Sequence, residues 1–146
     1  MNDSPLLLTK RLAYAYNVKD WVAFANLLDA NAVHELPDVE NDGIERHEGV
    51  EEIVDYMKDW STIIPDDKAT FINSQQIDAE TVVCDVSYSG TRAGVPFMLR
   101  GINVEADGSG YALEGSTTYR VLGNRIVRIT DRFNVRDFLA IFGVNG

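Results

Sequence analysis

The sequence predicts an α+β fold, in which helices come first and a long run of strands follows. Apolar residues recur at helical spacing over most of the first 64 residues. From about residue 70 onward, apolar and polar residues alternate in segments separated by turn signals, as in strands. Because helices and sheets each bury one face, we expect a strongly curved mixed or antiparallel sheet wrapped around three N-terminal helices.

The composition limits the class of protein. The 146 residues suit a single domain spanning 1–146, and 45% of them are hydrophobic, enough to form a core. A formal net charge of −10 disfavours nucleic acid and anionic membranes as partners. Cys84 is the only cysteine, so no internal disulfide is possible. The N-terminal residues lack the pattern of a signal peptide, and we expect a cytoplasmic protein.

The three expected helices have recognisable ends. The first begins at Ser4-Pro5, because serine caps a helix and proline suits the first helical position, and it ends at Asn17. The second covers about residues 19–28 and the third about residues 50–64. Each carries an apolar stripe that predicts packing against a core.

One short strand is expected between the second and third helices. Residues 32–36 place His34 on the same face as Ala32 and Leu36. Residues 37–46 are polar and acidic around an Asn-Asp-Gly turn, and we expect a loop there. We expect His47 near the start of the third helix rather than in a functional site.

The remaining chain predicts five strands and a closing helix. The expected strands cover residues 70–78, 81–91, 96–104, 111–122 and 125–133, and the helix covers residues 135–142. Residues 107–110 and the pair Gly123-Asn124 are the turns between the later strands.

The last strand holds the best single clue to function. One face carries Arg128, Thr130 and Arg132, and the other carries Val127, Ile129, Asp131 and Phe133. An inward carboxylate must be paired, hydrogen-bonded or set in a wet cavity, because its desolvation is costly. Asp131 is therefore the leading candidate for chemistry. The alternative is that it caps a turn or meets a buried arginine.

Two further polar residues fall on apolar faces. His34 has the chemistry to relay protons or polarise a carbonyl, or it is a half-buried histidine bonded to backbone. Arg100 shares a strand face with apolar residues, so it either stabilises an enolate or pairs with Asp85 or Glu114. We favour the structural pairing.

Aromatic residues are the other candidates for a binding site. Those expected to line a pocket or to donate hydrogen bonds are Tyr16, Tyr56, Trp60, Tyr88, Tyr119 and Phe133, with core packing as the alternative. Two histidines and one cysteine without ligand spacing predict no metal site. The sequence also lacks a phosphate-binding loop, a dinucleotide fingerprint and a nucleophile elbow.

Six segments carry a resemblance to a known family. They are residues 16–21 (YNVKDW), 32–37 (AVHELP), 46–49 (RHEG), 89–94 (SGTRAG), 123–131 (GNRIVRITD) and 137–143 (DFLAIFG). In this order the chain resembles the nuclear-transport-factor-2-like superfamily, and within it the SnoaL-like polyketide cyclases. The resemblance implies a cone-shaped fold around a deep apolar pocket, a small-molecule substrate, a homodimer, and neither metal nor organic cofactor.

The resemblance also implies roles for particular residues. The cyclases use an aspartate of the last strand as acid and base in an intramolecular aldol closure, and Asp131 matches it. Their first-strand asparagine is His34 here, and their penultimate-strand histidine is Thr117, which puts the identical reaction in doubt. Thr117 is still expected in the substrate-binding set.

Other branches of the superfamily match less well. The ketosteroid isomerases place their base at Leu36 and a tyrosine near Leu12, so we reject that activity. Scytalone dehydratases use two later histidines, and no histidine follows His47. Limonene-epoxide hydrolases use an Asp-Arg-Asp set, for which Asp131 and Arg100 are candidates, with Asp85 as the third member.

Three hypotheses follow. The first is a cofactor-independent cyclase or isomerase of a carbonyl-rich, polyketide-like molecule, with Asp131 as general acid and base and His34 as its partner. The second is epoxide opening, which requires a second acid, Asp85 or Glu114, near Asp131. The third is a binding domain without catalysis, which predicts a filled pocket or one without convergent polar groups.

Overall fold

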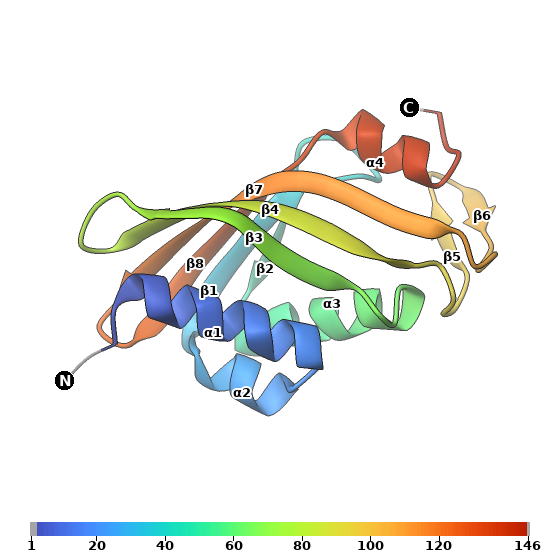
Figure 1. Ribbon diagram of the computed structural model, residues 1–146. Coiled ribbons are helices and arrows are strands. Elements are labelled where there is room, and N and C mark those ends of the chain that lie inside the picture. The colour runs from blue at the N-terminus through green and yellow to red at the C-terminus, as the bar shows by residue number, and fades with distance from the viewer. Residues whose placement is uncertain (1–2, 146) are drawn as a thin grey trace.

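The protein is an α+β structure built on one large sheet, as the sequence predicts. The computed structural model describes residues 3–145 (Figure 1). Helices α1 (Pro5–Val18), α2 (Trp21–Asn26) and α3 (Val50–Ile63) lie on the concave side of the sheet, and α4 (Val135–Ile141) follows the last strand. Across residues 3–145, no helix has the length and apolar content needed to cross a membrane.

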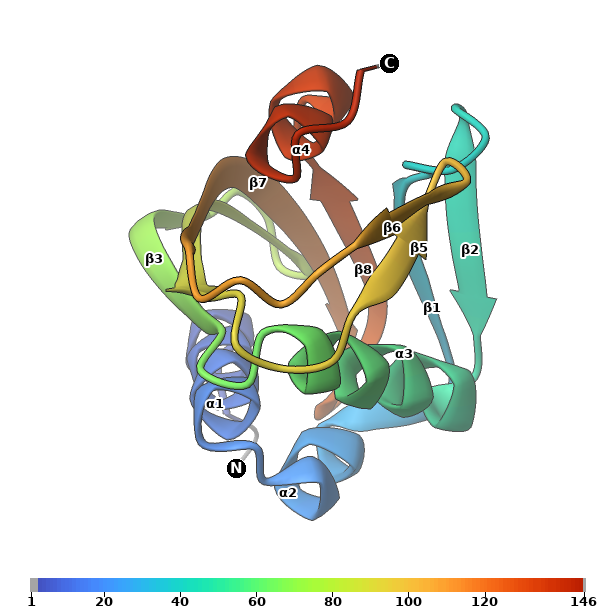
Figure 2. The same ribbon diagram turned by 90° about the vertical axis from the view of Figure 1, so that its right-hand side faces the viewer.

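The sheet is mixed and strongly curved. Its strands lie in the order β2 (Ile44–Glu48), β1 (Leu28–Pro37), β8 (Arg125–Arg132), β7 (Gly110–Leu122), β4 (Thr81–Thr91) and β3 (Lys68–Gln76). Only β1 and β8 run parallel, and the other neighbours are antiparallel. The sheet bends around the helices without closing, so it leaves β2 and β3 as edges (Figure 2). The expected cone is therefore an open one.

The first helix begins where the sequence predicts it, whereas α2 is shorter than the expected 19–28 because Leu28 already belongs to β1. The Ser4 side chain accepts a hydrogen bond from the Leu7 amide, and Pro5 is the first helical residue. Lys19 ends α1 in the left-handed conformation, with φ of 60°, and the Asp20 side chain then caps α2 by accepting from the Ala23 amide. The turn between α1 and α2 is therefore tight, and it holds Tyr16 and Lys19 close to the start of β3, as their bonds to Asp67 show.

Two apolar clusters hold the sheet to the helices. The first joins α1, α2 and α3 to the sheet through residues such as Leu8 and Ile53, both almost fully buried. Complete burial of such a side chain contributes roughly 1.5–3 kcal/mol. The second joins Trp60 of α3 to Phe138 and Phe142 at the end of the chain. Tyr88 packs against both clusters, so the space between them is where a cavity can form.

Three expectations about strands are wrong in detail. Residues 96–104 form two short strands, β5 (Phe97–Leu99) and β6 (Ile102–Val104), because Arg100 and Gly101 adopt positive φ and make a turn. The expected loop at 37–46 ends early, because residues 44–48 pair with β1 as β2. Val127 was expected to face the core, but the register between β7 and β8 shifts beside it, and Ile126 is buried there instead. Ile129 and Asp131 face inward as expected.

Candidate active site

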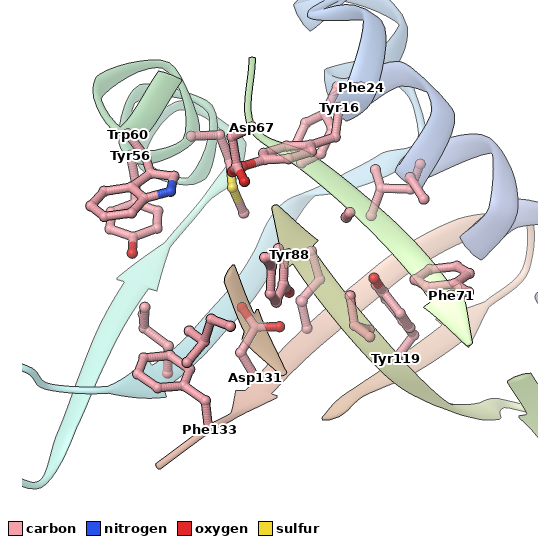
Figure 3. Close-up of a pocket in the computed structure, with 18 of the residues that line it drawn as sticks. Tyr16, Phe24, Tyr56, Trp60, Asp67, Phe71, Tyr88, Tyr119, Asp131 and Phe133 are labelled. Atoms are coloured by element: carbon pink, nitrogen blue, oxygen red, sulfur yellow. The ribbon is translucent and has the colours of Figure 1, made fainter. Parts of the chain in front are cut away.

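A cavity lies between the concave face of the sheet and the helices. Its volume is about 110 Å³, much more than the roughly 10–15 Å³ that one water needs. Six of the side chains expected to bind substrate line it, namely Tyr16, Tyr56, Trp60, Tyr88, Tyr119 and Phe133 (Figure 3). Two carboxyl groups also line it, Asp131 and Asp67. The cavity therefore combines an aromatic wall with two acids.

Asp131 projects into this cavity from β8 and is fully hydrogen-bonded. Its side chain is 16% exposed. Thr117, its partner in register on β7, donates a 2.7 Å hydrogen bond from Oγ1 to Oδ1. Nε2 of His34 lies 2.7 Å from Oδ2. Both carboxyl oxygens thus have a fixed partner, and these bonds hold the carboxyl group in one orientation beside the cavity.

A chain of polar contacts continues from Asp131 toward the protein surface. His34 is fully buried, and its Nδ1 lies 3.1 Å from Nδ1 of His47. These two histidines are register partners on β1 and β2. Nε2 of His47 then lies 2.7 Å from Oε2 of the partly exposed Glu45. The Tyr56 ring packs against both imidazoles, with centroids 5.5 and 4.4 Å away.

The two histidines link Asp131 to Glu45 in one continuous chain. Because the two Nδ1 atoms face each other at 3.1 Å, one of them must carry hydrogen and the other must accept it. The tautomers of the two rings are therefore coupled to each other.

Asp67 is the site residue that the sequence analysis missed. It lies between α3 and β3, is 1% exposed, and lines the cavity. The Tyr16 hydroxyl donates to Oδ2, and Oδ1 has no hydrogen-bond partner within residues 3–145. Burial raises the pKa of Asp67 to about 6, although the Tyr16 hydrogen bond and the Lys19 charge oppose the shift.

The tyrosines of the wall stay protonated at any ordinary pH. Burial is the largest cause that raises the pKa of Tyr16, Tyr56, Tyr88 and Tyr119 well above the usual 10. Neutral hydroxyls in an apolar cavity serve as hydrogen-bond donors to a carbonyl oxygen.

Arg100 does not reach the cavity, so its expected place in the binding set is wrong. From the β5–β6 turn its Nε donates to the Val39 carbonyl oxygen at 2.7 Å, and Nη2 pairs with Asp42 at 2.7 Å. The structural pairing that we favoured is therefore correct in kind, but Asp42 is the partner. Asp85 and Glu114 are both exposed.

Thr117 and His47 also differ from their expected roles. Thr117 is buried behind Asp131 and is not part of the cavity wall, so it positions the carboxylate. His47 lies close to the start of α3 as expected, but it does so on β2, where its ring also contacts His34 behind Asp131. The alternating residues after the Asn-Asp-Gly turn were the signal for a hairpin that pairs the two histidines. Within residues 3–145, no group of three or more side chains is arranged to hold a metal.

Comparisons with known proteins agree with this architecture. The SnoaL-like domain family matches residues 9–129. A proposed polyketide cyclase from Pseudomonas putida KT2440 superposes with a TM-score of 0.76 at 19% identity, covering 97% of this chain and 100% of that one. A proposed polyketide cyclase from Xanthomonas campestris pv. campestris gives 0.76 at 18% identity, with coverages of 95% and 96%.

A third structure has a different proposed activity. AclR from Streptomyces galilaeus, a proposed hydroxylase, gives a TM-score of 0.76 at 17% identity, covering 97% of this chain and 86% of that one. At such low identities these likenesses show the shared fold alone. A comparison with curated proteins finds no match.

Proposed function

Because this chain belongs to the SnoaL-like domain family, we propose that it is a cofactor-independent isomerase or cyclase of a carbonyl-rich, polyketide-like small molecule. The observation that carries the proposal is the setting of Asp131. This carboxylate opens into an aromatic cavity on one side and is held by Thr117 and His34 on the other. A carboxylate so placed is suited to general acid–base catalysis.

In the proposed reaction, Asp131 removes a proton from the carbon next to a substrate carbonyl. The electron pair of that C–H bond forms an enolate, whose oxygen accepts hydrogen bonds from tyrosine hydroxyls of the wall. In an isomerase, Asp131 returns the proton to another carbon. In a cyclase, the enolate carbon attacks a second carbonyl of the same molecule, and Asp131 gives the proton to the resulting alkoxide.

His34 and His47 support this cycle from behind the carboxylate. His34 is fully buried and reaches the cavity only through Asp131, so it acts as a positioning residue. His47 and Glu45 in turn hold the ring of His34 in place through its other nitrogen. Proximity of the two carbonyls in a folded substrate supplies a further share of the rate.

The other two hypotheses have weaker support. Epoxide opening required Asp85 or Glu114 beside Asp131, and both side chains are exposed. A binding domain without catalysis predicted a filled pocket or one without convergent polar groups, whereas Asp131 and Asp67 both open into a cavity. The family resemblance also leads us to propose a homodimer, which native mass spectrometry tests.

A probe ketone tests the chemistry without knowledge of the natural substrate. 2-Tetralone is flat and apolar and has acidic protons beside its carbonyl, so in D₂O a general base exchanges them for deuterium. We expect the wild type to accelerate this exchange and Asp131→Asn to lose at least ~100-fold of the acceleration. Asp85→Asn, which removes an exposed acid from the same sheet, is the control. Full acceleration by a folded Asp131→Asn variant overturns the proposal.

A further inference from the structure

The cavity holds a second carboxyl group that the proposed reaction does not use. Figure 3 shows Asp67 and Asp131 on opposite sides of the cavity. Asp67 is almost completely buried, yet only Oδ2 has a partner, the Tyr16 hydroxyl. Oδ1 is left without a hydrogen bond by residues 3–145. Buried polar atoms are nearly always paired, so an orphaned carboxyl oxygen calls for a ligand.

The local structure does not need a carboxyl group at this position. The neighbouring Asp66 joins the α3–β3 turn to β4, since its two oxygens accept from the amide and the hydroxyl of Thr91 at 2.7 and 2.9 Å. Lys19 contacts the main-chain oxygen of Asp67 and not its carboxyl group. The one side-chain partner of this carboxyl group among residues 3–145 is the Tyr16 hydroxyl, and a carboxylate is costly to bury with so few partners.

We propose that Asp67 and Tyr16 form a second binding subsite, which holds a hydroxyl group of the substrate at the end remote from Asp131. The proposal rests on the proposed function in requiring that this cavity holds the substrate. A hydroxyl suits Asp67 in both of its states, since it donates to the ionised carboxylate and accepts from the carboxylic acid. The Tyr16 hydroxyl stays bound to Oδ2 and leaves Oδ1 for the ligand.

The region between the two acids selects the body of the ligand. Asp67, Tyr111 and Asp131 line the same cavity. A single small molecule bound there can therefore contact both carboxyl groups. The wall between them includes Trp60 and Tyr88, which favour a flat apolar body. Two acids in one cavity disfavour an anionic ligand.

The substrate class that follows is an uncharged aromatic hydroxyketone. Its carbonyl lies toward Asp131, and a phenolic or enolic hydroxyl lies toward Asp67. This assignment narrows the polyketide-like class, because it requires oxygen functions at both ends of a planar body.

Matched pairs of ligands test the subsite. We would measure the affinities of the 5-, 6- and 7-hydroxy-2-tetralones against their methyl ethers, which keep the ring and the oxygen but lose the hydroxyl hydrogen. We expect the wild type to bind at least one hydroxy compound about 10-fold more tightly than its ether, as for a hydrogen bond to a charged group. In Asp67→Asn the amide oxygen takes the Tyr16 hydrogen bond, and the NH₂ group donates equally to hydroxyl and ether oxygen. The preference should disappear there and persist in Asp85→Asn.

The outcomes separate this inference from the proposed function. A preference that is absent from the wild type, or that persists in Asp67→Asn, overturns the subsite. Normal deuterium exchange by Asp131→Asn overturns the reaction but leaves the subsite intact. Should Asp67→Asn fail to fold, the NMR chemical shift of the Asp67 carboxyl carbon in the wild type tests the subsite instead. It should move with a hydroxy compound and stay in place with the ether, and no movement overturns the proposal.

Discussion

The two carboxyl groups on opposite sides of the cavity, Asp131 and Asp67, have very different surroundings. On the β8 wall, both oxygens of Asp131 are bonded, and a chain of two histidines connects it to Glu45 near the surface. On the opposite side, in the turn between α3 and β3, Asp67 is more deeply buried and has a single side-chain partner among residues 3–145, the Tyr16 hydroxyl. Burial raises the pKa of Asp67 to about 6, because the charged form is taken out of water. The comparison teaches that Asp131 is held in one orientation by two partners, whereas Asp67 keeps one oxygen without a partner among residues 3–145.

The largest effect should separate the two acids in catalysis. We expect Asp131→Asn to slow deuterium exchange by about 10²–10⁴-fold, because the base itself is lost. We expect Asp67→Asn to weaken the exchange of a hydroxytetralone by roughly 10-fold, through binding, and to leave that of 2-tetralone unchanged. Exchange rates over a range of ligand concentrations measure both. If both variants lost the same factor in the exchange rate of 2-tetralone, Asp131 and Asp67 would not have the separate roles that we propose.

The next effect concerns stability and has an unusual sign. The pKa of Asp67 is raised to about 6 in the folded protein, so the folded state binds this proton more tightly than the unfolded state does. The contribution of Asp67 to folding stability is therefore greatest at acid pH and is lost as pH rises from about 4 to about 6. Above that range the penalty is up to about 3 kcal/mol.

Asp67→Asn removes that penalty. The variant should exceed the wild type in free energy of unfolding by up to about 3 kcal/mol at pH 7.5, and by much less at pH 4. Urea unfolding at the two pH values measures the difference. The neighbouring Asp66→Asn is the control, because Thr91 lowers the pKa of Asp66 and its loss should destabilise. A destabilised Asp67→Asn would mean that this carboxyl group serves the fold.

A smaller effect should follow from breaking the histidine chain. His47→Gln keeps a hydrogen-bonding side chain but removes the ring that links His34 to Glu45, so His34 is held less firmly behind Asp131. We expect exchange of 2-tetralone to slow on the order of 10-fold, with ligand affinity nearly unchanged. Arg46→Gln changes an exposed residue of the same strand and should leave the rate alone. An unchanged rate in His47→Gln would restrict the support of Asp131 to His34 and Thr117.

The smallest effect belongs to Arg100, which lies outside both walls. Its pairing with Asp42 holds the β5–β6 turn against the β1–β2 turn. An ion pair that is largely at the surface is worth about 0–1 kcal/mol. Arg100→Ala should therefore cost about that much in urea unfolding and change the exchange rate by less than 2-fold. A larger loss of exchange rate in Arg100→Ala would mean that the β5–β6 turn contributes to the active site.

The sequence predicted the acid that lies on a strand, Asp131, and missed the acid that lies in a turn, Asp67. Alternation within residues 125–133 was sufficient to place Asp131 inside, and alternation within 32–36 did the same for His34. Asp67 lies in a turn, where no period tells inside from outside, and Pro65-Asp66-Asp67 indicated only the end of a helix. Its burial depends on α1 and β3 meeting, which is a tertiary contact.

The other errors also come from backbone geometry that periodicity does not contain. Arg100 was assigned to a continuous strand, but positive φ at Arg100 and Gly101 reverses the chain. Val127 was placed inward because a register shift of one residue is invisible to a strict alternation. His47 needed the pairing of β1 with β2, which depends on recognising the hairpin first.

The most direct test of the account is deuterium incorporation into 2-tetralone by the wild type, Asp131→Asn and Asp85→Asn under identical conditions. We predict fast exchange with the wild type and with Asp85→Asn, and exchange at or near the buffer rate with Asp131→Asn. Exchange by Asp131→Asn as fast as by the wild type would contradict the claim that the inward carboxylate of β8 is the base.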